Sequence, residues 1–262
     1  MLVIKNIYKE FNLTGNLEDK KIALNNVSLK IKKGEFVTVI GGNGSGKSTL
    51  MNIICGVHKP DKGKIILDGD DITNLKEHQR AKYFGRVFQD PKQGTAADMS
   101  ILENLEIATR RNKKITFRWG FIKNHQLLFK EQLKELNLGL ENRLNQKVGV
   151  LSGGQRQALT LLMATINKPK LLLLDEHTAA LDPKTSKIVL DLTQKIINDN
   201  NLTTIMITHN MRDAIKYGNR LVMLHNGEIL LDVSNQEKQQ LKVEDLLNKF
   251  DQANESITIP LI

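Results

Sequence analysis

The feature that most constrains the fold of this chain is a glycine-rich loop that directly follows an apolar strand. Residues 36–40 read Phe-Val-Thr-Val-Ile, and residues 41–48 read Gly-Gly-Asn-Gly-Ser-Gly-Lys-Ser. The second segment fits G-x-x-x-x-G-K-[ST], a pattern whose glycines let backbone N–H groups face an anion at the start of a helix. A helix is predicted from about Lys47 to Gly56. The strand, loop and helix together predict an α/β core with a phosphate site.

The polar residues of this loop have distinct predicted roles at a nucleoside triphosphate. We expect Lys47 to reach the β and γ phosphates, Ser48 to ligate Mg²⁺, and Thr49 to bond the α phosphate. The rest of the loop surrounds the phosphates mainly with backbone, and its residues are Gly41, Gly42, Asn43, Gly44, Ser45 and Gly46.

Composition limits the classes of protein that this chain can form. Its 262 residues are 40% hydrophobic and 26% charged, and no apolar run approaches the ~18 residues needed to cross a bilayer. The first residues show no leader pattern, so the cytosol is the expected compartment. The single cysteine, Cys55, is predicted to be a small core residue rather than a reactive thiol.

The formal net charge of +9 admits three kinds of polyanionic partner. These are nucleotide phosphates, anionic lipid head groups and nucleic acid. The alternative is a lysine-rich surface that confers solubility without such a partner. Charge alone does not choose among these interpretations.

The order of apolar patterns predicts how the chain is organised. Antiparallel strands are expected first, an inserted helical subdomain spans 91–168, and the α/β pattern then resumes. The predicted domains are therefore an α/β core of 1–90 and 169–262 and an inserted helical subdomain of 91–168. The expected elements are strands at 2–7, 22–29, 85–88, 171–174, 203–208, 221–224 and 228–231, a hairpin at 64–70, helices at 184–198 and 243–250, and a frayed tail at 256–262.

Two acidic residues follow the buried strand Leu171–Leu174, at the strand end where open α/β sheets bind ligands. We expect Asp175 to hold Mg²⁺ through water and Glu176 to act as general base on the attacking water. The alternative is that both acids cap the strand. Gln89 is a candidate sensor of Mg²⁺ or water, or else a solvated polar residue. His209 is a candidate γ-phosphate contact that orients Glu176, or else a structural histidine.

The pentapeptide Leu-Ser-Gly-Gly-Gln at 151–155 precedes an apolar helix and predicts a second anion site. The backbone amides of Gly153 and Gly154 and the hydroxyl of Ser152 would form it at the start of the helix. A simple helix cap explains Ser152, but not the whole pentapeptide just before the acidic strand. One chain would then carry two phosphate-binding helix ends.

Taken together, these motifs resemble those of the nucleotide-binding subunit of an ATP-binding cassette (ABC) transporter. The resemblance covers nearly the whole chain and implies a P-loop NTPase core with a mostly parallel sheet, an antiparallel N-terminal β subdomain and an inserted helical subdomain. It implies these roles: Gly41–Thr49 as Walker A, Gln89 as Q-loop, Ser152, Gly153, Gly154 and Gln155 as signature, Asp175 and Glu176 as Walker B, Ala180–Asp182 as D-loop, His209 as switch histidine, and Phe11, rather than Tyr8, as the aromatic that stacks on adenine.

Two departures from the family pattern stand out. Gly42 replaces the usual proline of Walker A, and residues 177–180 read His-Thr-Ala-Ala in place of Pro-Thr-Ser-Ala. The second change leaves Asp175, Glu176 and Asp182 in place but puts the hydrogen bonding of the D-loop in doubt. We interpret His177 as a residue tolerated in a turn and not as a catalytic group.

The resemblance implies an ATPase in which two cassettes close head to tail around two MgATP. The expected partners are a second copy or a homologous cassette, transmembrane permease subunits and a substrate-binding protein, with no nucleic acid. The chain is expected at the cytoplasmic face of the membrane, where it drives import of a solute, with amino acids as one candidate. The alternatives are a soluble ABC ATPase of a cytosolic assembly complex and a nucleic-acid-associated ATPase.

A basic and aromatic stretch at 110–130 lies within the predicted helical subdomain. No acidic residue occurs between Glu106 and Glu131. We predict a face toward anionic lipid or the permease, or alternatively an ordinary basic surface over packed aromatic residues. The residues concerned are Arg110, Arg111, Lys113, Lys114, Phe117, Arg118, Trp119, Phe121, Lys123 and Lys130.

Overall fold

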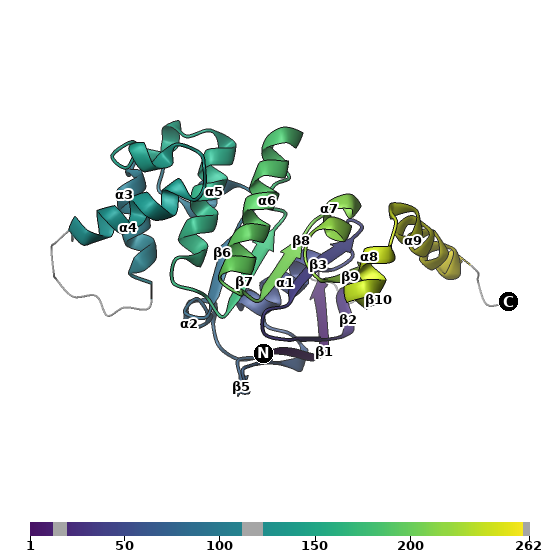
Figure 1. Ribbon diagram of the computed structural model, residues 1–262. Helices are drawn as coiled ribbons and strands as arrows, with labels where there is room; N and C mark the ends of the chain where they lie inside the picture. The colour runs from purple at the N-terminus through teal and green to yellow at the C-terminus, as the bar shows by residue number, and fades with distance from the viewer. Residues whose placement is uncertain (13–19, 112–122, 259–262) are drawn as a thin grey trace. The chain divides into compact units, whose positions relative to one another are not determined.

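The computed structural model describes residues 1–12, 20–111 and 123–258 (Figure 1). The chain divides into two compact units. Unit 1 consists of Met1–Ala81 and Thr203–Ile262, and unit 2 consists of Lys82–Leu202. This division differs from the predicted boundaries, because the strands on either side of the helical insertion fall in unit 2. The division into core and inserted subdomain at 90/91 and 168/169 stays a prediction.

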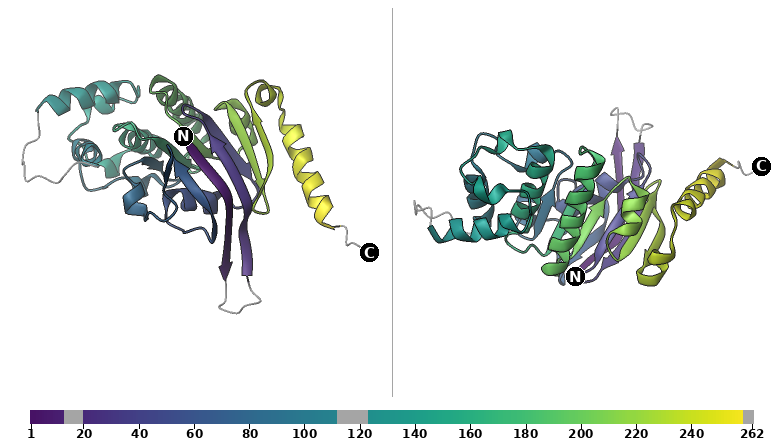
Figure 2. Two further views of the ribbon diagram at one scale, coloured as in Figure 1. Left: turned by 90° about the horizontal axis from the view of Figure 1, so that it is seen from below. Right: turned by 45° about the horizontal axis from the view of Figure 1, so that its top comes forward.

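Unit 1 contains an antiparallel sheet with the strand order β2-β1-β4-β5. Its strands are β1 (Leu2–Asn12), β2 (Lys20–Ile31), β4 (Lys62–Leu67) and β5 (Asp70–Asp71). Leu2 pairs with Ile31 on one side and with Leu67 on the other, and all three side chains are buried. Figure 2 shows β1 and β2 running side by side. The predicted antiparallel start and the hairpin between β4 and β5 are confirmed.

Parallel strands form the second sheet region of unit 1. There β3 (Phe36–Gly41) lies between β8 (Thr204–Ile207) and β9 (Arg220–His225), parallel to both. The last strand, β10 (Glu228–Ser234), pairs antiparallel with β9. The strands β3 and β8 are buried along nearly their whole length, as expected of parallel strands covered on both faces.

Five helices accompany these strands among the described residues of unit 1. They are α1 (Lys47–Cys55), α2 (Glu77–Arg80), α7 (Met211–Lys216), α8 (Asn235–Gln240) and α9 (Val243–Thr258). Helix α1 is terminated by Gly56, as predicted, and this C-cap glycine adopts a left-handed conformation. Helix α9 continues to Thr258, so the prediction of a frayed tail from residue 256 was wrong for its first three residues, and 259–262 lie outside the described part.

An apolar cluster fixes the C-terminal end of unit 1. Leu246 of α9 is fully buried against Ile40 of β3 and Met223 of β9, and Phe250 packs on the same cluster. Figure 2 shows α9 beside β10 and β9. The C-terminal helix is therefore part of the core that supports β3.

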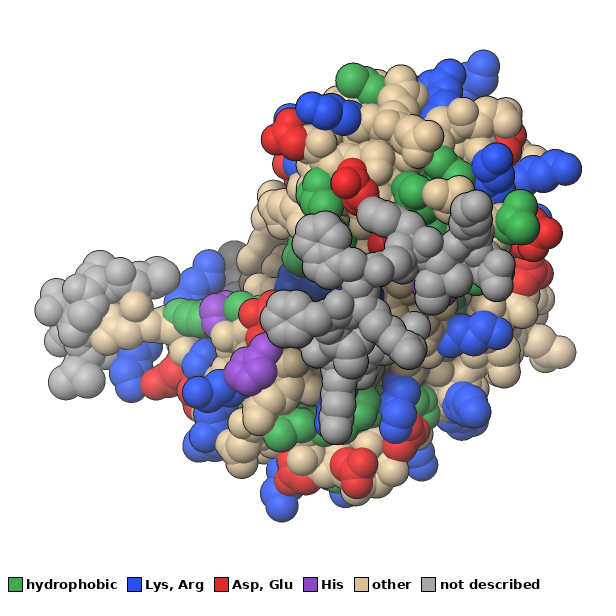
Figure 3. Space-filling model, turned by 90° about the vertical axis from the view of Figure 1, so that its left-hand side faces the viewer, with side chains coloured by type: hydrophobic (Ala, Val, Ile, Leu, Met, Phe, Trp, Pro, Cys, Tyr) green, Lys and Arg blue, Asp and Glu red, His purple; other side chains and the backbone are tan. Residues whose placement is uncertain are grey.

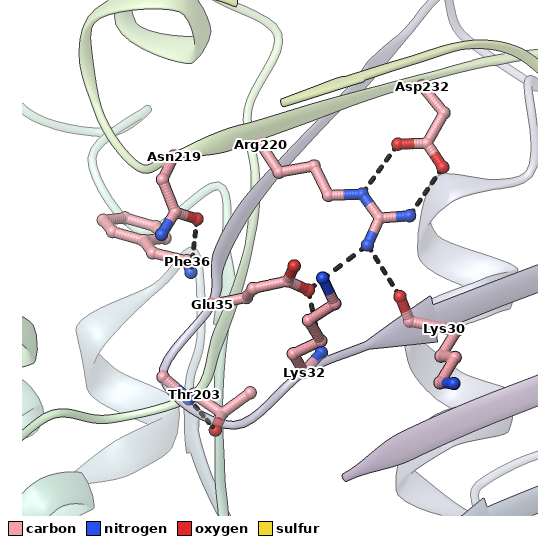
Figure 4. A network of polar contacts seen from close by, with 9 residues as sticks. Lys30, Lys32, Glu35, Phe36, Thr203, Asn219, Arg220 and Asp232 are labelled. Atoms are coloured by element: carbon pink, nitrogen blue, oxygen red, sulfur yellow. Dashed lines mark hydrogen bonds and ion pairs between the residues drawn. The ribbon is translucent and has the colours of Figure 1, made fainter. Parts of the chain in front are cut away.

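A polar network holds the start of β3 (Figure 4). Arg220 donates two hydrogen bonds to the carboxylate of Asp232, at 2.7 and 2.6 Å, and further bonds to Glu35 and to the carbonyl of Lys30. The hydrogen bonds to Asp232 raise the pKa of Arg220. The Asn219 side chain accepts from the Phe36 N–H. This network ties β2, β9 and β10 to the strand that leads into the glycine loop.

The described residues of unit 2 form a parallel strand pair and a set of helices (Figure 1). Strand β6 (Phe84–Val87) pairs with β7 (Leu171–Asp175), and the four leucines of β7 are fully buried. The helices are α3 (Ile101–Thr109), α4 (Lys123–Lys134), α5 (Gly153–Thr165) and α6 (Pro183–Asp199), with 3₁₀ turns η1 (Pro91–Gly94), η2 (Leu140–Asn142) and η3 (Val148–Val150).

The predicted helical character of 91–168 is confirmed for the residues that the structure describes. Turns and short loops separate the helices, no β-strand occurs among the described residues of this range, and an isolated β-bridge joins Ser100 to Lys147. Ser100 begins α3 with a capping box, in which its hydroxyl accepts from the Glu103 N–H and the Glu103 carboxylate accepts from the Ser100 N–H. Most of the basic and aromatic stretch, residues 112–122, lies outside the described residues, so its role stays a prediction.

Three observations concern the predictions made from composition: membrane spans, the cysteine and the surface charge. Within the described ranges, no helix is long and apolar enough to cross a membrane. Cys55 is buried, with 6% of its surface exposed, which confirms that it packs in the core. On the face shown in Figure 3, the described lysine and arginine side chains are dispersed among aspartate and glutamate side chains.

Candidate active site

The glycine loop connects β3 to α1 in a conformation that only glycine adopts easily. Gly44 has a φ of 79° and Gly46 a φ of 102°. A Cβ added to Gly46 would lie 2.5 Å from the carbonyl oxygen of Ala23, so space and backbone both demand glycine there. A side chain at Gly42 would meet nothing within 4 Å. The replacement of the family's proline by Gly42 is therefore not forced by crowding.

Lys47 and Ser45 bring polar groups to this loop. Lys47 is 7% exposed, and its Nζ donates to the carbonyls of Gly41 and Gly42 at 2.8 and 2.9 Å. The buried Ser45 Oγ has no hydrogen-bond partner among the described residues. An anion above the loop would offer acceptors to both groups, so the residues present fit a bound phosphate.

A cavity of about 240 Å³ extends from the loop to the aromatic residue predicted to stack on adenine. Phe11, Lys21 and Ala23 line it together with residues 44–49. Phe11 contacts the ring of His58 edge-on, with 5.3 Å between ring centroids. Tyr8 does not line the cavity, and its hydroxyl donates to Glu10 at 3.1 Å. The geometry favours Phe11 over Tyr8 as the base contact, as the sequence analysis does.

Lys21 is a cation of this cavity that the sequence analysis missed. Its Nζ lies 3.8 Å from the position that a Cβ of Gly44 would take. The register of β1 and β2 places Lys21 opposite Phe11. Lys21 belongs to none of the sequence motifs. The pairing of β1 with β2 is the signal that places it at the cavity.

His209 also belongs to unit 1, where it follows β8. The side chain is exposed and precedes Asn210, whose Oδ1 caps α7 by accepting from the N–H groups of Arg212 and Asp213. Burial raises the pKa of Asp213, and the nearby charge of Lys216, followed by His209, opposes that shift. His209 thus lies between the carboxyl end of a parallel strand and the N-cap of α7, a helix that was not predicted from the sequence.

The acidic residues predicted to act on ATP lie in unit 2, at the carboxyl end of β7. Since Val87 pairs with Leu174, the ends of β6 and β7 meet at one edge. Asp175 Oδ2 is 3.2 Å from Nη2 of Arg86, a residue that the sequence analysis did not single out. Gln89 is exposed, two residues past the end of β6. The structure therefore brings Gln89 and Asp175 to the same edge of this strand pair.

Glu176 has an unusual backbone. Its φ is 44°, in the left-handed region that non-glycine residues rarely occupy. Its carbonyl accepts from the Ala179 N–H at 2.9 Å, which closes a tight turn after β7. A non-glycine residue in this region marks local strain, which tends to occur at functional sites.

His177 lies in the turn after β7, as predicted, but its side chain is buried. It is 2% exposed, and its Nε2 lies 3.1 Å from Oγ1 of Thr193 on α6. Burial lowers the pKa of His177 to about 4, so the imidazole is neutral near pH 7. The side chain in place of the family's proline thus forms a buried hydrogen bond.

The signature pentapeptide forms the start of α5. Ser152 Oγ accepts from the Gln155 N–H at 3.3 Å, while Ser152 N–H donates to the Gln155 side chain at 3.2 Å. This capping box bears out the simple cap interpretation of Ser152 and leaves its anion-binding role as a prediction. Ser152 and Gly153 are exposed to solvent at this helix end.

The signature packs against the D-loop of the same unit. A Cβ on Gly153 would lie 3.2 Å from Cδ2 of Leu181, and one on Gly154 would overlap with Thr185. Asp182 caps α6, where its Oδ1 accepts from the Thr185 N–H at 3.0 Å. Hydrogen bonds from Thr185 lower the pKa of Asp182. The glycines of the signature therefore allow α5 to approach α6 closely.

The donor chemistry fits Mg²⁺ that arrives with a nucleotide. Within the described part of the chain, no group of three or more His, Cys, Asp or Glu side chains forms a metal cluster. Mg²⁺ commonly takes one or two protein oxygens together with waters and substrate phosphates. In unit 1 the exposed hydroxyl of Ser48 is an oxygen of this kind, and in unit 2 the carboxylate of Asp175 is another.

Comparisons with known proteins agree with these features. The family model for ABC transporters matches residues 24–179. The chain is 48% identical over 254 residues to the tyrosine transport ATP-binding protein of Clostridioides difficile, covering 97% of this chain and all of that protein. It is 34% identical to a methionine import ATP-binding protein of Oceanobacillus iheyensis, covering 88% of this chain and 65% of that protein.

Solved structures of ATP-binding cassettes share the fold. A dimeric cassette, MJ0796, bound to ADP and phosphate is 31% identical, with a TM-score of 0.73 over 89% of this chain and 98% of that one. The cassette MJ1267 in its ADP conformation is 26% identical, with a TM-score of 0.77 over 99% of both chains.

The glycine loop on a parallel strand, the acidic strand end and the signature helix define an ATP-binding cassette. This chain belongs to the ABC transporter family. It is an ATPase, and it resembles the nucleotide-binding subunits of importers. The predicted α/β fold class is thereby confirmed.

Proposed function

We propose that this chain hydrolyses ATP to drive import of an amino acid through a separate membrane permease. The observation that carries this proposal is the similarity to a tyrosine transport ATP-binding protein across the full length of that relative. The methionine import relative supports the same class of substrate. Tyrosine and methionine are both amino acids. The choice of substrate would rest with the permease and a substrate-binding protein.

Two copies of the chain, or this chain and a homologous cassette, act together in this proposal. The relative MJ0796 is described as a dimer with ADP and phosphate bound. Ser152 and Gly153 are exposed at the positive end of α5, where they are accessible to a nucleotide held by another copy. The phosphates would then join two protomers, and loss of the γ phosphate would release them.

Each residue of the proposed active site has one role. The loop amides and Lys47 hold the phosphates, Phe11 stacks on adenine, and Ser48, Asp175 and Gln89 hold Mg²⁺ directly or through water. Bound Mg²⁺ would neutralise phosphate charge. Glu176 accepts a proton from the attacking water, while His209 donates a hydrogen bond to the γ phosphate. Asp182 caps α6 at the D-loop.

The cytoplasmic face of the membrane is the proposed location. Since the described helices include none that crosses a bilayer, attachment would come from contact with permease subunits. Gln89 and the helical part of unit 2 are the proposed docking region.

The experiment that tests this function is purification of the chain with its membrane partner. A tagged copy is isolated from detergent-solubilised membranes of the native cell, and the complex is placed in proteoliposomes with labelled tyrosine or methionine. We expect a co-purified permease and uptake that requires ATP and is absent with Glu176→Gln. Isolation of a stable soluble complex without a permease, or hydrolysis that DNA stimulates, would contradict the proposal.

A further inference from the structure

We propose that His177 and Thr193 form a positioning pair that holds the Glu176 turn in its active conformation. This inference rests on the proposed role of Glu176 as general base. The pair joins the turn after β7 to the middle of α6 through the 3.1 Å hydrogen bond between His177 Nε2 and Thr193 Oγ1.

The Glu176 backbone requires a restraint of this kind. A left-handed φ costs a non-glycine residue about 1–2 kcal/mol and persists only where the surroundings impose it. Glu176 adopts a φ of 44°, and the next residue, His177, is 2% exposed. Anchoring the side chain of His177 therefore restrains the peptide that sets the direction of the Glu176 carboxylate.

The direction of the hydrogen bond follows from the second bond of Thr193. Its hydroxyl donates to the Val189 carbonyl at 2.7 Å, and a hydroxyl has a single hydrogen. The oxygen must therefore accept the hydrogen of His177 Nε2. This sets the tautomer of the imidazole and the orientation of its ring.

Helix α6 connects this pair to the signature. The same helix begins at the Asp182 cap and carries Thr185, against which Gly154 of α5 packs. The turn of Glu176 is thus anchored to the helix that contacts the signature. An apolar residue at 177 would fill the space but would supply no directional bond to that helix.

Thr193→Val tests the pair because it removes the hydroxyl with little change of shape, while Thr193→Ser keeps the hydroxyl and serves as the matched control. We expect kcat for ATP to fall about tenfold in the valine variant, since small displacements of a catalytic group have large effects on rate. The Kd for MgATP should stay within about twofold, because the loop that binds phosphate belongs to unit 1. The serine variant should keep most of the wild-type kcat.

His177→Gln and His177→Leu give the second measurement. Glutamine can donate from its amide to Thr193, whereas leucine cannot. Rates are measured on protein shown by circular dichroism to be folded. Equal kcat in all four variants, or a parallel loss of kcat and MgATP affinity in Thr193→Val, would overturn the proposal. Full turnover in Glu176→Gln would instead refute the role of Glu176, so the two failures are distinguishable.

Discussion

Nη2 of Arg86 lies 3.2 Å from Oδ2 of Asp175, so a guanidinium already neutralises the carboxylate that we propose as a Mg²⁺ ligand. Both side chains are about one-fifth exposed, and the Arg86 guanidinium also lies over the ring of Phe88, 4.7 Å from its centroid. A metal ion that approaches Asp175 would compete with this cation.

Arg86→Gln should therefore lower the Mg²⁺ concentration at half-maximal ATPase rate. We expect a shift of about three- to tenfold, the effect of removing one close positive charge in a partly screened site. Titration of Mg²⁺ at fixed ATP measures it, with Arg86→Lys as the control that keeps the charge. If Arg86→Gln instead needed more Mg²⁺ for half-maximal rate, the Arg86–Asp175 ion pair would favour metal binding rather than compete with it.

Lys21 should contribute to nucleotide affinity, because it lines the cavity between Phe11 and the glycine loop. Lys21→Ala should raise the Kd for ATP about three- to tenfold, and less at high salt, since the side chain is exposed. Fluorescent nucleotide titration at two salt concentrations provides the measurement. Lys64→Ala, an exposed lysine of β4 outside that cavity, is the matched control. If the two variants bound ATP with equal affinity, Lys21 would not contribute to nucleotide binding.

Glu176→Gln should separate binding from hydrolysis. The amide keeps the size of the side chain but cannot take a proton, so kcat should fall by roughly 10² to 10⁴. MgATP should still bind, and size-exclusion chromatography should show more dimer with ATP than for the wild type. Near-normal turnover would contradict the assignment of Glu176 as general base.

The parts of the fold that follow from local patterns were predictable from sequence. The β3–loop–α1 unit needs only an apolar run, glycines and a helix start, and its predicted bounds differ from the observed ones by one residue at the end of the strand and one at the end of the helix. The short helices α7 and α8, each six residues long, were not predicted, because packing rather than propensity stabilises such short elements.

Site residues outside motifs were not predictable for a related reason. Lys21 reaches the glycine loop through strand register, and Arg86 reaches Asp175 across two strands that lie far apart in the chain. His177 was interpreted as a tolerated turn residue, because nothing local shows that Thr193 lies beside it. Motifs identify the atoms that meet the substrate, whereas tertiary contacts reveal which residues hold those atoms.

The stability of the protein should fall at acidic pH through His177. Burial lowers its pKa to about 4 in the folded state, against about 6.5 in an unfolded chain. Above pH 6.5 both states are neutral and the residue has no effect. As the pH falls from 6.5 to 4, the unfolded chain binds a proton that the folded chain does not, so the free energy of unfolding drops, by about 3 kcal/mol at most. Urea unfolding at pH 7.5 and pH 5.0, in EDTA, measures this loss. His177→Gln should lose less stability over the same interval, because glutamine does not titrate, and an equal loss in both proteins would assign the acid sensitivity to other groups.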